Sequence, residues 1–279
     1  FGYCSGASVP LLRAGCHDGS MLKDPKIAPR LIVFSDLDGT LLDHESYSWD
    51  LASPALDQMR ALGIPLVLAS SKTTAEIADL RSNLGFEDAP AIVENGAGVL
   101  EPGGDATADR SAHSAICAAL SDLDPDLRRC FTGFSDWTIH ELAQQTGLSL
   151  DQAKSAARRQ FSEPGLWRGT PEQRAIFETN LAQNGIFARQ GGRYLTLSMG
   201  AIKADRMAEI VARFDPKPVT MALGDAPNDV EMIRAADHGV VVMNSHGPGL
   251  PALEGEATGR ITRTVEPGPK GWNTAVLDR

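Results

Sequence analysis

Short apolar runs alternate with amphipathic segments over the first organised part of the chain. The run Leu31 to Phe34 is followed closely by two aspartates, and a run of this kind predicts a strand buried on both faces. Apolar residues at helical spacing behind Ser53-Pro54 predict a helix, which Gly63 ends. The predicted elements are, in order, a strand at 31–35, a helix at 53–62, a strand at 64–69, a helix at 74–84 and a strand from 91. This order is typical of a parallel sheet with right-handed crossovers.

The pattern changes near residue 107 and returns near residue 194. Between these points we expect helices at 111–122, 136–145, 150–160 and 170–183 and extended segments at 129–134, 162–168 and 186–199. The earlier pattern then resumes with a helix at 203–214, a strand at 219–223, a helix at 230–236 and a strand at 239–243.

These elements predict an α/β fold with a doubly wound parallel sheet and an inserted α+β cap domain. We expect the core domain at 30–106 and 194–279 and the cap domain at 107–193. One larger continuous sheet is the alternative. Residues 1–29 have no sustained period and are expected to be an irregular N-terminal extension, of which Phe1 to Met21 contributes little to function.

Polar residues follow each predicted strand of the core. Asp36 and Asp38 leave the first strand on the same side, because side chains alternate along a strand. An isolated Asp-x-Asp-Gly is more often an acidic turn than a site. However, the strand at 219–223 also ends in an acidic cluster, Gly224-Asp225-x-x-Asn228-Asp229. The carboxyl ends of parallel strands meet at one edge, so the two clusters together predict the oxygen ligands that Mg²⁺ prefers.

The residues at these strand ends resemble those of a known family. Asp36-Leu37-Asp38-Gly39-Thr40, Ser70, Lys203 and the cluster at 224–229 are similar to the four ordered motifs of the haloacid dehalogenase-like phosphatase superfamily. Further blocks resemble the mannosyl-3-phosphoglycerate phosphatases, over residues 30–279: Ser70-Ser71-Lys72-Thr73, Glu94-Asn95-Gly96, Phe161-Ser162-Glu163-Pro164, Gly191-Gly192-Arg193 and Gly268-Pro269-Lys270-Gly271-Trp272. The resemblance implies a Rossmann-like hydrolase core and Mg²⁺-dependent hydrolysis of a phosphate monoester through an aspartyl-phosphate. The implied substrate is mannosyl-3-phosphoglycerate or its glucosyl analogue.

The resemblance also implies a role for each motif residue. Asp36 would be the nucleophile and Asp38 the general acid and base, while Ser70 and Lys203 would bind the transferring phosphoryl group. The metal ligands would be Asp36, the Asp38 main-chain carbonyl, Asp225 and Asp229. Three alternatives stay open: Ser70 as a helix N-cap, Lys203 as a solvated first-turn lysine, and Asp229 as a cap of the helix near Val230.

Substrate recognition is expected where the cap closes over this edge. A glycosyl-phosphoglycerate carries a carboxylate besides its phosphate, so its binding site requires cations. Arg is well suited to bind a planar carboxylate through paired hydrogen bonds. The residues expected to bind substrate are Ser71, Lys72, Glu94, Asn95, Ser162, Glu163, Arg168, Gly192, Arg193 and Asn228.

Composition narrows the classes of partner. A net charge of −10 argues against nucleic acid or an anionic membrane as the main partner. The partner that the resemblance implies is a small phosphorylated molecule, which requires a local concentration of basic residues because the overall charge is negative. The four cysteines show no CxxC pair or metal-ligand spacing, which favours a cytoplasmic location. His44, His113, His140, His238 and His246 lack partners at ligand spacing and are expected to be non-catalytic.

Two other functions remain possible from the sequence. The nearer is a phosphatase of the same superfamily that acts on another sugar phosphate or small organic phosphate. The more distant is a receiver-type signalling module that stores phosphate on Asp36, against which the length of the chain and the large insertion argue. The oligomeric state is left open.

Overall fold

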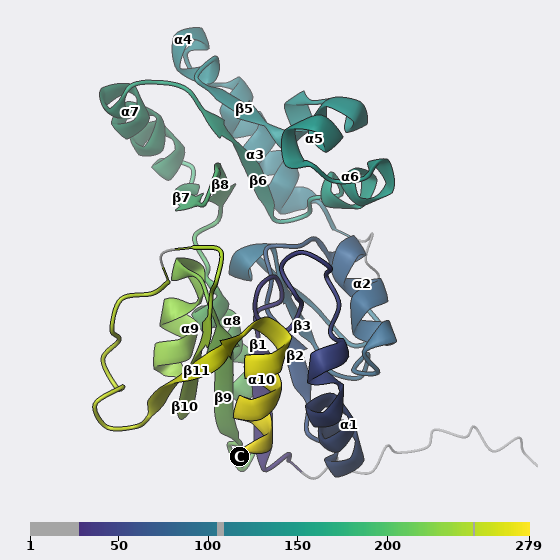
Figure 1. The fold of residues 1–279 in the computed structure, drawn as a ribbon. Helices are drawn as coiled ribbons and strands as arrows, with labels where there is room; N and C mark the ends of the chain where they lie inside the picture. Colours follow the sequence, from purple (N-terminus) through teal and green to yellow (C-terminus); the bar gives the residue numbers. More distant parts are fainter. Residues whose placement is uncertain (1–27, 105–108, 248) are drawn as a thin grey trace, which may run out of the picture.

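The computed structural model describes residues 28–104, 109–247 and 249–279 (Figure 1). The expected N-terminal extension lies outside these ranges except for its last two residues. Within the described ranges, no helix combines the length and the apolar character that crossing a membrane requires.

The core is a five-stranded parallel sheet with the strand order β11-β10-β9-β1-β2. β1 lies between β2 and β9, and its residues are almost all buried. The strands are β1 (Leu31–Ser35), β2 (Leu66–Leu68), β9 (Val219–Gly224), β10 (His238–Met243) and β11 (Ile261–Pro267). The predicted doubly wound parallel sheet is therefore confirmed.

Helices cover both faces of this sheet because β1 alternates its apolar side chains between them. Val33 packs with α1, α2 and α10 on one face, whereas Ile32 and Phe34 pack with α8 and α9 on the other. The core helices are α1 (Ser53–Leu62), α2 (Thr74–Asn83), α8 (Lys203–Val211), α9 (Val230–Ala235) and α10 (Gly268–Leu277). Burial on both faces explains the continuous apolar run that predicted β1.

The third predicted strand, β3 (Ala91–Val93), continues the parallel order through a single bridge. Ile92 bridges to Ala69 beside β2, and β3 forms an antiparallel pair with β4 (Gly98–Leu100). β4 and β11 were not expected from the sequence. In β11 most side chains are at least partly exposed, with Ile261 as the buried exception, so no apolar run marks this edge strand.

The cap contains a four-stranded antiparallel sheet with the order β5-β6-β8-β7. Its sheet and helices lie beyond the carboxyl ends of the core strands (Figure 1). The strands are β5 (Phe131–Gly133), β6 (Ser162–Trp167), β7 (Phe187–Gly191) and β8 (Tyr194–Ser198). The helices of this part are α3 (Ser111–Ser121), α4 (Pro125–Arg128), α5 (Ile139–Thr146), α6 (Leu150–Ala156) and α7 (Pro171–Ala182).

The expected boundary between cap and core at 193/194 requires a correction. It falls inside the hairpin of β7 and β8, where Gly191 pairs with Tyr194. β8 also pairs with β6, so the second sheet continues to Ser198. The inner side chains of β8, Leu195 and Leu197, pack under α3 and α7 in the cap's own apolar core. Hydrophobic burial therefore holds β8 with the cap.

Candidate active site

The carboxyl ends of β1 and β9 bring the predicted acidic clusters together. Asp36 follows β1, and its backbone N–H donates to Leu223 O of β9 at 2.9 Å. The Lys203 ammonium lies 2.6 Å from Asp36 Oδ1 and 2.7 Å from Asp229 Oδ1. All three side chains are buried. The alternative that Lys203 is a solvated first-turn lysine is therefore wrong.

Close contacts at two glycines, Gly96 and Gly224, determine the positions of Lys203 and Asp229. Gly96 has φ +96°, and a Cβ there would lie 2.1 Å from the carbonyl carbon of Ile202, so the turn after β3 presses on the start of α8. At Gly224 a Cβ would lie 2.4 Å from Asp229 Cβ. Asp229 Oδ2 accepts the N–H groups of Asp225 and Ala226, so this side chain holds the loop while Oδ1 holds Lys203. It caps the 3₁₀ turn before α9, and it makes no side-chain cap bond to α9 itself.

Asp225 is oriented by two donors from neighbouring loops. Thr40 Oγ1 donates to Oδ1 at 2.9 Å, and Asn244 Nδ2 donates to Oδ2 at 2.7 Å. Asn244 was missed from the sequence, although it follows β10 as the other polar residues follow their strands. The same rule, a polar residue directly after a buried strand, identifies it.

The buried carboxylates of this site outnumber the cation that lies between them. Carboxylate oxygens of Asp36, Asp225 and Asp229 lie within 4.8 Å of one another, and Lys203 is the cation between them. Burial raises the pKa of Asp36 well above its usual value and Asp229 raises it further, against the lowering by Lys203. Burial also raises the pKa of Asp225. Full ionisation would leave an excess of two negative charges, which a divalent cation would neutralise.

Asp38 lies at the rim of the same site and pairs with Lys72. The Lys72 Nζ to Asp38 Oδ2 distance is 2.9 Å, while Asp38 Oδ1 is buried and has no hydrogen-bond partner. Burial lowers the pKa of Lys72, but Asp38, together with Glu76 and Tyr47, raises it above its usual value, so this lysine stays charged. Ser70 is buried and its Oγ accepts the Lys72 N–H. Thr73, with Glu76, forms the capping box of α2, so the alternative that Ser70 is the N-cap is wrong.

Glu94, in the turn after β3, forms hydrogen bonds that connect the core to the cap. Its carboxylate accepts the backbone N–H groups of Gln160 and Phe161 at 2.8 and 3.2 Å and the Ser162 hydroxyl at 2.7 Å. Arg159 Nε lies 3.3 Å from the same carboxylate. Glu94 and Ser162 are fully buried, and they bind each other. These contacts favour a structural role over the expected binding of substrate hydroxyls.

Four other residues expected to bind substrate lie away from this edge. Glu163 is buried in contacts with His113 and Ser135 of the cap. The others, Arg168, Gly192 and Arg193, are exposed at the ends of cap strands, and none of them lines the cleft between the β7–β8 hairpin and the core. Arg168 follows the far end of β6, about 17 Å along the strand from its core end. Arg193, at the hairpin tip, donates to Tyr194 Oη and lies over its ring.

The cleft between the β7–β8 hairpin and the core has a volume of about 260 Å³, and residues along the whole of β7 line it. On the core side Asn228 Nδ2 donates to Asn95 Oδ1 at 3.0 Å, and both residues line the cleft. On the cap side the lining polar residues include Arg189, Gln190, Thr196 and Ser198. Arg189 was missed from the sequence. It stands in the middle of β7, in the same hairpin as Arg193, and it lines the cleft whereas Arg193 does not.

Comparison with solved structures identifies similar folds. BT1666 from Bacteroides thetaiotaomicron, described among phosphatases of the haloalkanoate enzyme superfamily, is 18% identical with a TM-score of 0.57 and covers 94% of this chain and 98% of its own. TM0651 from Thermotoga maritima is 16% identical with a TM-score of 0.61, over 90% and 97%. The sucrose-phosphatase of Synechocystis sp. PCC6803, solved with sucrose and phosphate, is 13% identical with a TM-score of 0.57, over 89% and 97%.

The sequence itself matches one family over most of its length. Residues 33–165 and 168–249 match the haloacid dehalogenase-like hydrolases, and these ranges contain the two acidic strand ends together with Ser70 and Lys203. The four motif positions that suggested the resemblance therefore lie in matched segments of a parallel α/β core with an antiparallel cap. The chain belongs to the haloacid dehalogenase-like hydrolase family.

Proposed function

We propose that the chain is a Mg²⁺-dependent phosphatase whose nucleophile is Asp36. The observation that supports this most is the burial of Asp36 against Lys203, beside Asp225 and Asp229, with Asp38 two residues further on at the rim. A carboxylate nucleophile divides a difficult displacement into two easier ones. The metal would be held by Asp36, Asp225 and the Asp38 main-chain carbonyl, with Asp229 beside them.

The proposed reaction has two displacements at phosphorus. Lys203 holds Asp36 Oδ1, so we assign the attack to Oδ2; the new O–P bond forms as the bond from phosphorus to the leaving oxygen breaks. Asp38 takes up a proton from solvent as its ion pair with Lys72 opens, gives that proton to the leaving alkoxide, and then takes one from the water that hydrolyses the aspartyl-phosphate. Ser70 and Lys203 bind the transferring group. A bound Mg²⁺ would supply positive charge that offsets the approach of two anions.

The expected substrate is a glycosyl-3-phosphoglycerate, with mannose or glucose as the sugar. The cleft beside the site supports this choice. Arg189, whose only ion pair among the described residues is a long, exposed one to Glu231 at 4.0 Å, provides a cation for a carboxylate, and hydroxyl and amide groups are present for a sugar. The similar sucrose-phosphatase was solved with sucrose and phosphate, so this fold accommodates a disaccharide. Another sugar phosphate or small organic phosphate is the alternative. A receiver-type module has no support, since the matched family consists of hydrolases.

The first experiment tests the chemistry. Phosphate release is measured from a panel of small phosphate monoesters, including glycosyl-3-phosphoglycerates and hexose phosphates, with Mg²⁺ and after chelation. We expect turnover only with Mg²⁺, and its loss in Asp36→Asn. Near wild-type turnover by this variant would refute the nucleophile, and undiminished turnover after exhaustive chelation would refute the metal requirement.

The second experiment tests the substrate and uses two arginines of one hairpin. Loss of a hydrogen bond to a charged group costs about 1.5–3 kcal/mol, so Arg189→Gln should raise KM for a glycosyl-phosphoglycerate roughly 10- to 100-fold. Hexose phosphates, which lack the carboxylate, should be little affected. Arg193→Gln is the matched control and should leave KM for both kinds of substrate unchanged, because this side chain binds Tyr194 at the hairpin tip. Equal effects on both substrates would refute the carboxylate assignment.

A further inference from the structure

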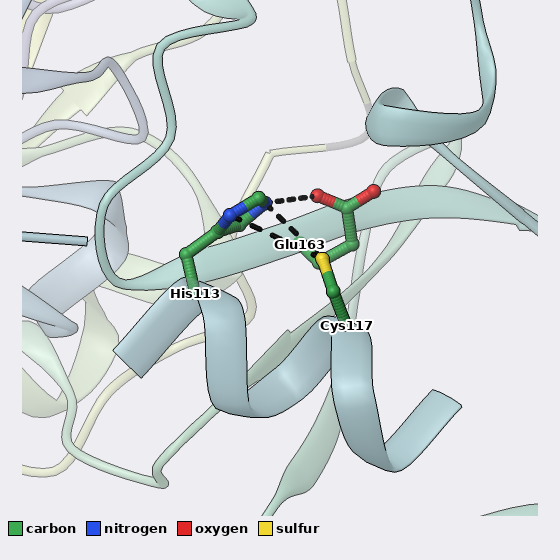
Figure 2. Close-up of side chains that lie close together, drawn as sticks. All are labelled: His113, Cys117 and Glu163. Carbon is green, nitrogen blue, oxygen red and sulfur yellow. Dashed lines mark hydrogen bonds and ion pairs between the residues drawn. The ribbon is translucent and has the colours of Figure 1, made fainter. Parts of the chain in front are cut away.

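A cluster of potential metal ligands lies in the cap, outside the candidate active site. His113 and Cys117 are four residues apart on α3 and so share one face of the helix. Figure 2 shows Glu163 of β6 pointing toward them. Glu163 Oε2 lies 2.8 Å and Cys117 Sγ 3.7 Å from His113 Nε2. His113 and Glu163 are buried, whereas Cys117 is partly exposed and leaves a path for entry.

The distances between these atoms are close to those in a tetrahedral zinc site. Bonds of about 2.0–2.3 Å from Zn²⁺ to N, O and S ligands place neighbouring ligand atoms roughly 3.3–3.6 Å apart. The two measured separations lie on either side of this range. Ser135 Oγ lies 3.1 Å from Glu163 Oε2, 3.2 Å from His113 Nε2 and 3.9 Å from Cys117 Sγ. A hydroxyl or water at this position would provide the fourth corner.

The carboxylate of Glu163 is held in place by its neighbours. Ser135 N–H donates to its Oε1 at 2.7 Å, which turns Oε2 toward the histidine. A Cβ at position 133 would lie 2.2 Å from Oε1, so Gly133 leaves the room that this carboxylate occupies. Partners of this kind, which orient a ligand without binding the metal, are typical of built metal sites.

We propose that His113, Cys117 and Glu163 bind a divalent transition-metal ion in the cap, with Zn²⁺ as the best match. Thiolate and imidazole ligands favour Zn²⁺ over Mg²⁺, which favours the oxygen ligands of the candidate active site. From the sequence, neither the cysteines nor His113 are expected to have partners at ligand spacing. That expectation compared residues of one type and did not consider His113 and Cys117 together on the predicted helix, and Glu163 reaches them only through the packing of α3 against β6 in the folded cap.

Metal binding at this site requires a rearrangement of protons. The Cys117 thiol releases its proton to solvent, and so does His113 Nε2, whose proton faces Glu163 Oε2 before the metal binds; the bound imidazole is then neutral, with one proton on Nδ1. Arg110 Nη2 lies 3.3 Å from that Nδ1 as a second donor, so the guanidinium must turn away. The bound metal would join α3 to β6 near the cap–core junction, where His113 N–H donates to Gln160 O.

Co²⁺ titration of the full chain tests the proposal, because cobalt bound to a thiolate gives a near-ultraviolet charge-transfer band that oxygen ligands do not give. In the wild type we expect the band to reach its maximum at one equivalent of Co²⁺ and to disappear when Zn²⁺ displaces the cobalt. The control variants Cys130→Ser and Asp225→Asn should behave in the same way. Cys117→Ser should abolish the band, and His113→Gln should weaken the affinity at least about tenfold. Circular dichroism verifies the fold of each variant.

The outcomes separate this site from the phosphatase proposal. Absence of the band in the wild type, or its persistence in Cys117→Ser, would overturn the cap site; the latter result would place the thiolate at another of the four cysteines. The band does not depend on phosphate release, so a failed substrate panel leaves this result unchanged.

Discussion

Replacement of Lys203 by Met should destabilise the protein strongly. The ammonium is 1% exposed and pairs with two buried carboxylates, Asp36 at 2.6 Å and Asp229 at 2.7 Å. Met is of similar length, so the main change is the loss of charge, which leaves the carboxylates buried without a cation. Removing one partner of a buried ion pair costs about 3–5 kcal/mol. We expect the free energy of unfolding to fall by that amount in urea denaturation without divalent cations.

Lys72→Met is the matched control for this measurement. Lys72 pairs with Asp38, but the side chains are 21% and 36% exposed, so the control should lose about 1 kcal/mol or less. Adding Asp229→Asn to Lys203→Met should recover part of the loss, because the amide oxygen can accept from the Asp225 and Ala226 N–H groups while its NH₂ faces Asp36. Equal losses of unfolding free energy in the two lysine variants would refute the reasoning that burial determines how much each ion pair contributes to stability.

The remaining predictions concern the junction, a close approach and pH. Glu94→Gln replaces one acceptor oxygen by a donor, so the cap amides that it binds should exchange hydrogen at least about tenfold faster. Gly96→Ala should lower stability by about 2 kcal/mol or more and reduce turnover, since its Cβ would displace the start of α8 and Lys203. Burial raises the pKa of Asp237, but hydrogen bonds from Thr220 lower it more; the resulting stability is present above about pH 4 and is lost as pH falls through the lowered value. Asp237→Asn should therefore reduce the difference in unfolding free energy between neutral and acidic pH, measured in urea.

The core and its acidic edge could be predicted because their signals are local. Buried strands produce continuous apolar runs, and the residues that follow them, Asp36 and Asp225, identify the edge wherever the chain continues. The same rule failed for β11, because an edge strand with one buried side chain has no apolar run.

The residues of the cap that face the core could not be predicted. Arg189 and Arg193 stand in one hairpin, and sequence alone does not say which of the two lines the cleft. The contact of Glu94 with Ser162 joins the turn after β3 to a strand of the cap sheet, and no spacing or periodicity indicates it. Prediction of these residues therefore required the orientation of the cap sheet relative to the core, which the sequence pattern does not contain.

The position of β1 in the middle of the sheet has a consequence for synthesis on the ribosome. Its partner β9 and the buried lysine are made only after the whole cap, more than 160 residues later. Until then, one edge of β1 lacks its neighbour, and the nascent nucleophile lacks both its cation and its second acidic loop. An apolar strand with an unpaired edge favours aggregation. Assembly of this centre is therefore a late event in synthesis of the chain.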